Sequence, residues 1–288
     1  MGLYFVTTDH LEDGLWFRDD DDYKTGMNYV AVLSFVLGIK VIAFILMSNH
    51  VHFLVICNSR EEAELFINEY KKKYGKYYRH KYGVGELLRR NAIDIQEITL
   101  EEESPERIIA YILMNCVAAN ICLTADGYQW GSGNCYFKMR KEKGASLGNL
   151  SSRERIRKLH SVAKLPSEWM ILDDGYIAPD SYVDVAFVER LYRTPKRMNY
   201  FLMNSSKAKK TMANNENKVP SFRDQLVIAS IPDLCRSLFG VSSIKELNDN
   251  QTMELIKQLK RCFYSDVNQI ARVTGLSYSD VAYRLDHY

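Results

Sequence analysis

The stretch Phe44-Ile-Leu-Met-Ser-Asn-His-Val-His-Phe-Leu-Val-Ile56 decides how this chain folds. Its two apolar runs flank a pair of turn-forming residues, a pattern that predicts two strands joined by a tight turn. Side chains alternate along a strand, so His50 and His52 project from one face. Val51 and Phe53 project from the other face, into a hydrophobic core. The sequence therefore predicts two imidazoles side by side on a rigid strand.

Two histidines in this arrangement are candidate metal ligands. Neutral imidazole binds divalent cations, and two histidines on one strand leave coordination positions open for a third ligand, water or a phosphate oxygen. The alternative interpretation is that His50 and His52 are ordinary polar residues on an exposed sheet face. The neighbouring elements have to decide between the two.

Hydrophobic periodicity and turn residues predict a regular order of elements in the first part of the chain. They are a strand at Leu3–Thr8, a helix at Asp20–Gly38, strands at Ile39–Met47 and His50–Cys57, a helix from Arg60 to about Tyr82, a strand at Asn91–Ile98 and a helix at Pro105–Asn120. The order βαββαβα is that of an α+β fold, a ferredoxin-like or RRM-like split βαβ sandwich. We expect its helices on one face of an antiparallel sheet.

Composition narrows the class of protein. The chain has 288 residues, of which 47% are hydrophobic, so it can bury a substantial core and form more than one domain. Its six cysteines form no Cys-x-x-Cys pair, and no basic leader followed by an apolar stretch opens the chain, which favours a reducing cytoplasm. The longest apolar run, Val41–Met47, is far shorter than the about 20 residues of a membrane span. We therefore expect a cytoplasmic protein without a membrane partner.

The predicted helix Pro105–Asn120 carries two polar side chains on one face. Ser104 and Pro105 are typical N-cap and first-turn residues. Tyr111 and Asn115 follow four residues apart, a spacing that places both on the same side of a helix. The chain has 19 tyrosines, so a tyrosine on a helix is by itself equally compatible with a place in the core.

The segment Leu46-Met-Ser-Asn-His-Val-His-Phe-Leu54 closely resembles the histidine-hydrophobic-histidine box of the single-tyrosine HUH transposases, and among them the REP-associated tyrosine transposases. The resemblance extends from about Leu3 to Tyr136 and implies the HUH fold for this region. It also implies that His50 and His52 hold Mg or Mn.

The resemblance continues into the helix after the fourth strand. The family's helix is similar to Tyr-Ile-x-x-Asn-Pro-Val, which implies that Tyr111 is the nucleophile and Asn115 the third metal ligand. This chain departs from the pattern at Cys116, where the family usually has proline, so the helix need not end at Asn115. Further on, Tyr128-Gln-Trp-Gly-Ser132 resembles the family's Tyr-Pro-Trp-Ser-Ser segment. Tyr128 and Tyr136 are the next candidate nucleophiles.

The resemblance implies metal-dependent cleavage and rejoining of DNA strands, as in a transposase, through a covalent 5′-phosphotyrosine intermediate on single-stranded or hairpin DNA. A phenol is a poor nucleophile near neutral pH, so a divalent cation, Mg or Mn, is needed to polarise the phosphate. Two alternatives stay open. One is a domesticated, non-catalytic DNA-binding regulator, and the other is a metal-dependent hydrolase that activates water instead of a tyrosine.

Basic residues are concentrated in one helix although the net charge of the chain is only +2. The segment Tyr70–Tyr82 interleaves six Lys and Arg residues with five tyrosines, which predicts a surface that neutralises phosphates and stacks on unpaired bases. The alternative is a solvated helix face. A family-like basic segment follows, although its expected phenylalanine is missing. The candidate DNA-binding residues of this region are Lys72, Lys73, Lys76, Arg79, Arg89 and Arg90.

The second half of the chain predicts further domains. A basic stretch, Lys138–Ser152, has the composition of a linker, so we expect the HUH catalytic domain to cover residues 1–140. A helical region follows over 141–250, and residues 251–288 form a C-terminal helix-turn-helix module. Its second helix would expose Tyr283 and Arg284 to duplex DNA, whereas a helical hairpin used only for packing is the alternative. We expect a monomer or a homodimer.

Overall fold

The computed structural model describes residues 1–9, 14–83, 91–99, 104–138, 143–206, 222–263 and 265–286. The order of its first elements is the predicted βαββαβα. They are β1 (Gly2–Thr8), α1 (Asp20–Leu37), β2 (Lys40–Met47), β3 (His50–Cys57), α2 (Arg60–Tyr82), β4 (Ile93–Glu97) and α3 (Pro105–Leu113).

The two long helices begin and end at residues suited to those positions. The side chains of Asp19 and Ser59 accept hydrogen bonds from backbone N–H groups in the first turns of α1 and α2. Such caps satisfy donors that have no partner within the helix. Gly38 and Gly83 end the same helices with φ values of 67° and 71°, a left-handed conformation that glycine adopts without strain.

The four long strands form one antiparallel sheet in the order β2-β3-β1-β4. Because β3 lies between β2 and β1, the histidine strand is central. His52 stands opposite Ile45 of β2 and Thr7 of β1, and His50 stands opposite Met47. Directly opposed residues share a face of the sheet, so this register places the histidines near the end formed by the β2–β3 turn.

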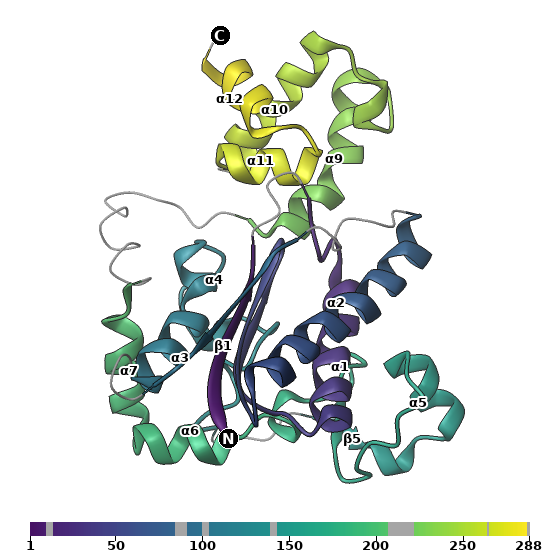
Figure 1. Cartoon of the computed structure of the whole chain (residues 1–288). Coiled ribbons are helices and arrows are strands. Elements are labelled where there is room, and N and C mark those ends of the chain that lie inside the picture. The colour runs from purple at the N-terminus through teal and green to yellow at the C-terminus, as the bar shows by residue number, and fades with distance from the viewer. Residues whose placement is uncertain are drawn as a thin grey trace.

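Helices cover both faces of this sheet (Figure 1). On one face, the Phe53 ring lies 5.3 Å from Phe66 and 5.5 Å from Tyr70, both on α2. On the other face, α3 places the Tyr111 ring 5.9 Å from that of His52. The prediction of helices on one face was therefore wrong. Both faces of β3 are buried, and a strand of this kind needs a covering layer on each side.

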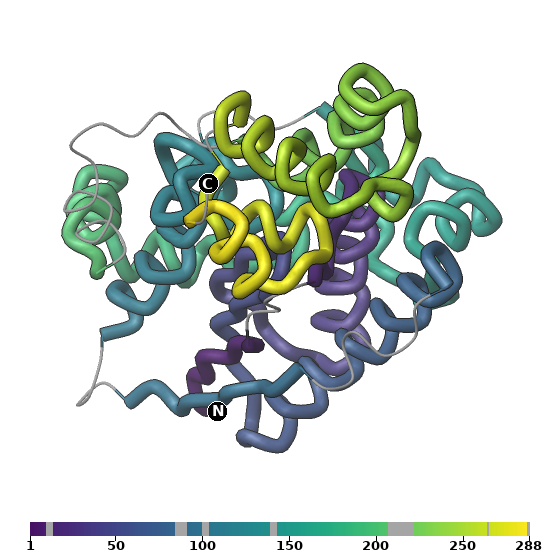
Figure 2. Tube along the Cα trace, turned by 90° about the horizontal axis from the view of Figure 1, so that it is seen from above, coloured from purple at the N-terminus to yellow at the C-terminus, as the bar shows by residue number. Residues whose placement is uncertain are grey.

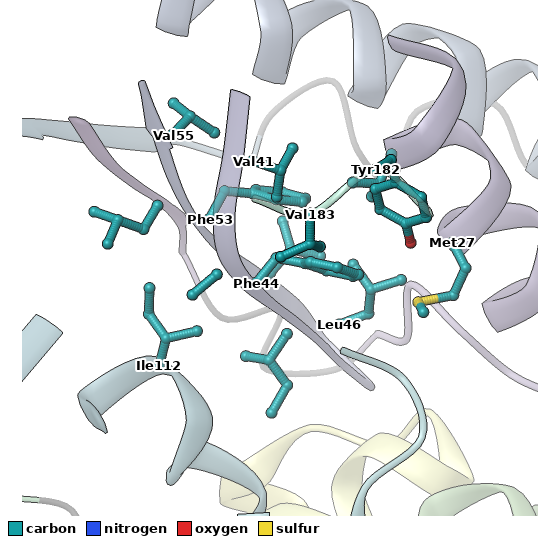
Figure 3. Packing of buried hydrophobic residues seen from close by; sticks show 14 of the residues in the cluster. Met27, Val41, Phe44, Leu46, Phe53, Val55, Ile112, Tyr182 and Val183 are labelled. Atoms are coloured by element: carbon teal, nitrogen blue, oxygen red, sulfur yellow. The ribbon is translucent and has the colours of Figure 1, made fainter. Parts of the chain in front are cut away.

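The hydrophobic core continues well beyond the sheet. Figure 3 shows Phe44 of β2 between Phe53 and Tyr182, with ring centroids 6.1 and 6.0 Å away. Val183 forms a parallel bridge with Val41 at the edge of β2. Segments that follow the sheet in the chain thus complete its core.

These following segments contain strands as well as the predicted helices. Residues 144–146 and 170–172 pair as a two-stranded antiparallel sheet that the sequence interpretation did not anticipate. The elements of this part are α4 (Asn115–Ala118), η1 (Ala125–Gly127), β5 (Gly144–Ser146), η2 (Leu147–Asn149), α5 (Ser152–Leu159), β6 (Met170–Leu172), η3 (Pro179–Ser181), α6 (Val185–Tyr192) and α7 (Pro195–Met203). The predicted linker, Lys138–Ser152, contains a strand, because β5 pairs with β6 (Gly144 with Leu172, Ser146 with Met170).

The buried hydrophobic residues of the described ranges form two clusters. The first runs from Tyr4 to Met198 and contains buried residues on both sides of residue 140. The second runs from Val227 to Val281. The domain limits at residues 140 and 250 stay a prediction. The buried hydrophobic residues fall into two groups, of which the first ends at Met198 and the second begins at Val227.

The second cluster is the core of a small helical bundle. Its elements are α9 (Asp224–Phe239), η4 (Ile244–Glu246), α10 (Asp249–Phe263), α11 (Val267–Thr274) and α12 (Tyr278–Asp286). Figures 1 and 2 show this bundle at one end of the sheet. Gly275, with φ at 73°, ends α11 before the turn into α12. Two short helices therefore lie where the helix-turn-helix pattern predicts them.

One described segment, Asp224–Glu246, is long and apolar enough to cross a membrane by length and composition alone. The sequence interpretation did not single it out. Its helix α9 has 16 residues, or about 24 Å at 1.5 Å per residue, which is shorter than a hydrocarbon layer of about 30 Å. Val227, Ile231 and Cys235 of this helix are buried in the bundle.

Candidate active site

The two predicted metal ligands lie together on the face of β3 that α3 covers. His50 and His52 are each 4% exposed, and their ring centroids are 4.8 Å apart with an interplanar angle of 88°. The Nδ1 of His50 lies 2.9 Å from the Asn49 Oδ1. An amide oxygen can only accept, so Nδ1 carries the proton and the lone pair of this ring lies on Nε2. That tautomer presents Nε2 for metal binding.

The candidate nucleophile lies beside the histidines. The half-buried Tyr111 ring meets the His52 ring edge to face, with centroids 5.9 Å apart and an angle of 83°. Phe5 of β1 stacks on His52 at 5.8 Å and contacts Tyr111 at 6.0 Å. The structure therefore brings together two residues, His52 and Tyr111, that lie on different elements and were predicted separately.

Asn115 is held by the carbonyl oxygens of its own helix. Its Nδ2 donates to the carbonyl oxygens of Tyr111 at 2.9 Å and of Ile112 at 3.1 Å. Of the two polar atoms of this amide, Oδ1 is the one with lone pairs for a cation. Asn115 is buried, so its orientation is restricted by packing as well.

The predicted continuous helix over 105–120 is interrupted. α3 ends at Leu113 and α4 begins at Asn115, with Met114 between them. The sequence interpretation left this break open because Cys116 replaces the usual proline. Here the Asn115 side chain binds the Tyr111 carbonyl, and the Cys116 thiol donates to the Leu113 carbonyl at 3.3 Å. Side-chain donors of this kind compete with the helical backbone bonds.

The donors at this site suit a divalent cation. Within the ranges that the structure describes, no three His, Cys, Asp or Glu side chains gather into a possible metal site. A third protein ligand beside His50 and His52 would therefore be of another type, and the amide oxygen of Asn115 is such a donor. Imidazole nitrogen suits divalent transition metals and an amide oxygen suits Mn or Mg, and three such ligands leave positions for water or phosphate.

The two alternative tyrosines have structural roles. The Tyr128 hydroxyl donates to the Leu46 carbonyl at 2.8 Å, and the Tyr136 hydroxyl donates to the Ile42 carbonyl at 2.6 Å. Burial raises the pKa of both phenols well above the usual range. Buried, hydrogen-bonded phenols cannot approach a phosphate, so Tyr111 is the candidate that the geometry favours.

The sequence interpretation missed an acidic residue on the histidine face. Thr7 stands opposite both His52 of β3 and Asp94 of β4, so the three share one row across the sheet. Two strand spacings separate Asp94 from His52, or about 10 Å. The alternation of Ile93 and Ile95 with Asp94 predicted a strand, but only the pairing with β1 shows which face Asp94 occupies.

The structure contradicts the prediction that the tyrosines of α2 form a base-stacking surface. Tyr70, Tyr74 and Tyr78, spaced by four residues, are fully buried. The hydroxyls of Tyr77 and Tyr82 donate to the Asp22 carboxylate at 3.0 and 2.8 Å. These tyrosines form one face of the helix against the protein, so they are not available to stack on bases.

The cations of α2 are placed differently from its tyrosines. Lys72, Lys76 and Arg79 are exposed, although Lys72 also bonds to Glu69 at 2.8 Å. The Lys73 ammonium lies 5.8 Å from the centroid of the Tyr29 ring. α2 packs on the sheet face opposite the histidines, so these cations do not line the candidate active site. Arg89 and Arg90 lie outside the described residues.

The two predicted contacts of the C-terminal module differ in their surroundings. Tyr283 is 62% exposed on α12. The Arg284 guanidinium bonds to the Asp249 carboxylate at 2.8 Å and to the Asp249 carbonyl at 3.1 Å. Arg284 thus joins α12 to α10, and it would have to leave this pair to reach a phosphate.

Comparison with known proteins finds a match for one part of the chain. Residues 17–92 match the family model described as "Transposase IS200 like". No curated protein and no solved structure matches the chain. The matched segment contains His50 and His52 but ends before Tyr111 and Asn115. The matched segment, 76 of the 288 residues, is similar to this transposase family.

Proposed function

We propose that this protein cleaves and rejoins DNA strands in a metal-dependent reaction with a covalent 5′-phosphotyrosine intermediate, acting on single-stranded or hairpin DNA. The family suggests transposase activity in general terms and, with it, DNA binding and DNA processing. The observation that carries the finer proposal is the contact between the Tyr111 and His52 rings at 5.9 Å.

The proposed residues divide the chemistry between them. His50, His52 and Asn115 would hold Mg or Mn, which supplies the charge that polarises the scissile phosphate. Tyr111 loses its phenolic proton, and its oxygen forms a bond to phosphorus. The bond from phosphorus to the 3′ oxygen breaks, and that oxygen takes up a proton. Attack of the resulting 3′-hydroxyl on the phosphotyrosine reverses these changes and reseals a strand without a nucleotide cofactor.

The proposed DNA contacts lie on two surfaces. Lys72, Lys73, Lys76 and Arg79 of α2 would neutralise phosphates, a sequence-independent contribution to affinity. The C-terminal helices α11 and α12 would bind duplex DNA through residues such as Tyr283. Because α2 lies behind the sheet, a strand bound there has to pass around the sheet before it reaches Tyr111.

A labelled single-stranded oligonucleotide from the flanks of the gene tests the proposal directly. With Mg or Mn, the unmodified protein should form a covalent adduct that survives denaturation. Tyr111→Phe removes one hydroxyl and little surface, so it should abolish the adduct and leave DNA binding nearly intact. Tyr136→Phe, at the other alternative tyrosine, is the matched control and should retain the adduct. An adduct that persists in Tyr111→Phe would contradict the assignment of the nucleophile.

A non-catalytic DNA-binding regulator is the second candidate. It is favoured by one observation, namely that the family match ends at residue 92, before the proposed nucleophile. DNA affinity without any adduct or nick, under conditions where Mn binds, would support it. A metal-dependent hydrolase differs from both because it would nick DNA without a protein-DNA adduct, and Tyr111→Phe would leave its rate unchanged.

A further inference from the structure

The C-terminal bundle is joined to the end of the sheet that carries the histidines. Figures 1 and 2 show the bundle beyond this end. The first turn of α9 makes the connection, because the Gln225 Nε2 donates to the Phe17 carbonyl at 3.0 Å and to the Tyr23 hydroxyl at 3.3 Å. These bonds join Gln225 to Phe17 and Tyr23, which precede it in the chain by 208 and 202 positions.

A short series of hydrogen bonds leads from Phe17 to the histidine strand. The Phe17 N–H donates to the Ser48 carbonyl at 3.2 Å, in the turn between β2 and β3. The next residue, Asn49, accepts the hydrogen bond from the Nδ1 of His50 at 2.9 Å. The amide of Gln225 therefore connects to a candidate metal ligand through Phe17 and one turn.

A second series of contacts runs through Tyr23. Its ring stacks on Phe17 with centroids 4.6 Å apart. The Tyr128 hydroxyl lies 3.5 Å from the Tyr23 hydroxyl and donates to the Leu46 carbonyl at 2.8 Å. Leu46 stands opposite Val51, the residue between the two histidines. Both series thus end at the segment that orients the histidine strand.

The same turn of α9 is fixed from the opposite side by α11. The buried Asp224 carboxylate accepts from the Gln269 Nε2 at 2.9 Å and from the Arg272 Nε at 3.0 Å. A buried carboxylate with several donors holds a defined geometry. Gln225 follows Asp224 directly, so its position is set by the core of the C-terminal bundle.

We infer that Gln225 is a positioning residue for the candidate metal-binding histidines. By bonding Phe17 and Tyr23 it holds the Ser48–Asn49 turn and, through that turn, the orientation of the His50 ring. The inference rests on the proposed function only in treating the histidines as ligands. Direct partners of a ligating histidine change metal affinity roughly 10–100-fold. Gln225 acts through further contacts, and we expect an effect of about 3–10-fold.

The test compares two full-length variants. Gln225→Met keeps the side-chain size and removes the donor. Gln258→Met is the matched control, because Gln258 lies on α10 of the same bundle and its Nε2 bonds to Glu254 on the same helix. Mn2+ binding is titrated by electron paramagnetic resonance, with His52→Ala defining the background. The dissociation constant should rise about 3–10-fold in Gln225→Met only.

A second measurement needs no metal. In nuclear magnetic resonance spectra of the metal-free protein, the His50 ring signals should shift in Gln225→Met, while those of His80 and His160, remote from this contact series, should not. Equal Mn2+ affinity and equal His50 signals in the two variants would overturn the inference. If the unmodified protein shows no Mn2+ binding that depends on His52, the proposed metal site fails and the His50 signals alone decide on positioning.

Discussion

The Asn115 side chain donates a hydrogen bond to the carbonyl oxygen of Tyr111 at 2.9 Å. The candidate third ligand and the candidate nucleophile are therefore held by one contact at the point where α3 ends. A change at Asn115 should affect both the proposed metal site and the course of the chain after Tyr111. This coupling allows the ligand role of Asn115 to be separated from its structural role.

Asn115→Asp keeps an oxygen ligand and removes the two Nδ2 donors, whereas Asn115→Ala removes both. Loss of hydrogen bonds to buried carbonyls costs about 1–3 kcal/mol, so both variants should unfold at lower denaturant concentration. Only Asn115→Ala should also lose Mn2+ affinity. Equal Mn2+ affinities in the alanine variant and the unmodified protein would remove Asn115 from the ligand set.

His50→Ala and His52→Ala should each lower the rate of adduct formation by at least about 100-fold, because a ligand to the proposed cation is lost. Excess chelator should have the same effect on the unmodified protein, and added Mn should restore activity. His160→Ala is a control remote from the site. Adduct formation that is indifferent to chelator would exclude a metal-supported mechanism at these histidines.

Tyr74→Phe should destabilise the protein without impairing catalysis. The Tyr74 hydroxyl donates to the Trp16 carbonyl at 2.5 Å in the core, and removing such a bond costs about 1 kcal/mol. Tyr200, which is 65% exposed, provides the control substitution Tyr200→Phe with no expected cost. The measurement is urea denaturation followed by circular dichroism, together with DNA binding. A free energy of unfolding equal to that of the unmodified protein would contradict the structural role of the Tyr74 hydroxyl.

A fragment ending at residue 206 should fold, because the first hydrophobic cluster ends at Met198. A fragment ending near residue 145 should not, since it omits Val183, Val188 and Tyr192, which are buried in that cluster. The 1–206 fragment should lose duplex affinity and show a shallower salt dependence, by about one unit for each lost phosphate contact. Titrations with duplex DNA at several salt concentrations measure both the affinity and its salt dependence. Affinities equal to those of the full chain would assign the bundle to packing.

Substitutions in α12 test the same module more locally. Tyr283→Ala should weaken duplex binding at unchanged stability, because its side chain is exposed. Arg284→Ala should also lower stability, since it removes the pair with Asp249. Asp249→Ala breaks that pair while leaving the arginine, so it controls for the loss of the pair. Duplex binding weakened equally by Asp249→Ala and Arg284→Ala would show that Arg284 acts structurally.

Thiol reactivity should distinguish Cys116 in α4 from Cys122 after this helix. Interaction with Cys116 lowers the pKa of Cys122 below the ordinary value, whereas the same interaction and burial raise the pKa of Cys116. Iodoacetamide should therefore modify Cys122 at a lower pH than an ordinary thiol, with Cys116 reacting last. Peptide mapping by mass spectrometry follows both. Cys116→Ala should move the Cys122 profile to higher pH, and an unchanged profile would contradict the pairing.

Local sequence patterns predicted most of the first seven elements. Ser104 and Pro105 mark the start of the helix that carries Tyr111, and alternation along β3 places both histidines on one face. The α2 tyrosines were misinterpreted because a helix that interleaves Lys and Tyr looks the same whether the tyrosines face solvent or core. The bond from Gln225 to Phe17 could not be predicted, since no periodic pattern records contacts between residues 208 positions apart.

The position of β1 between β3 and β4 also constrains how the protein is made. Its residues are synthesised before those of both neighbouring strands, and its partners extend to Glu97. At about 5–20 residues per second, roughly 5–20 s of synthesis separate the first strand from its last neighbour. During that interval Tyr4 and Val6, both buried in the finished fold, have no completed sheet to join. Slowing translation before residue 97 would lengthen this exposure and raise the demand for chaperones.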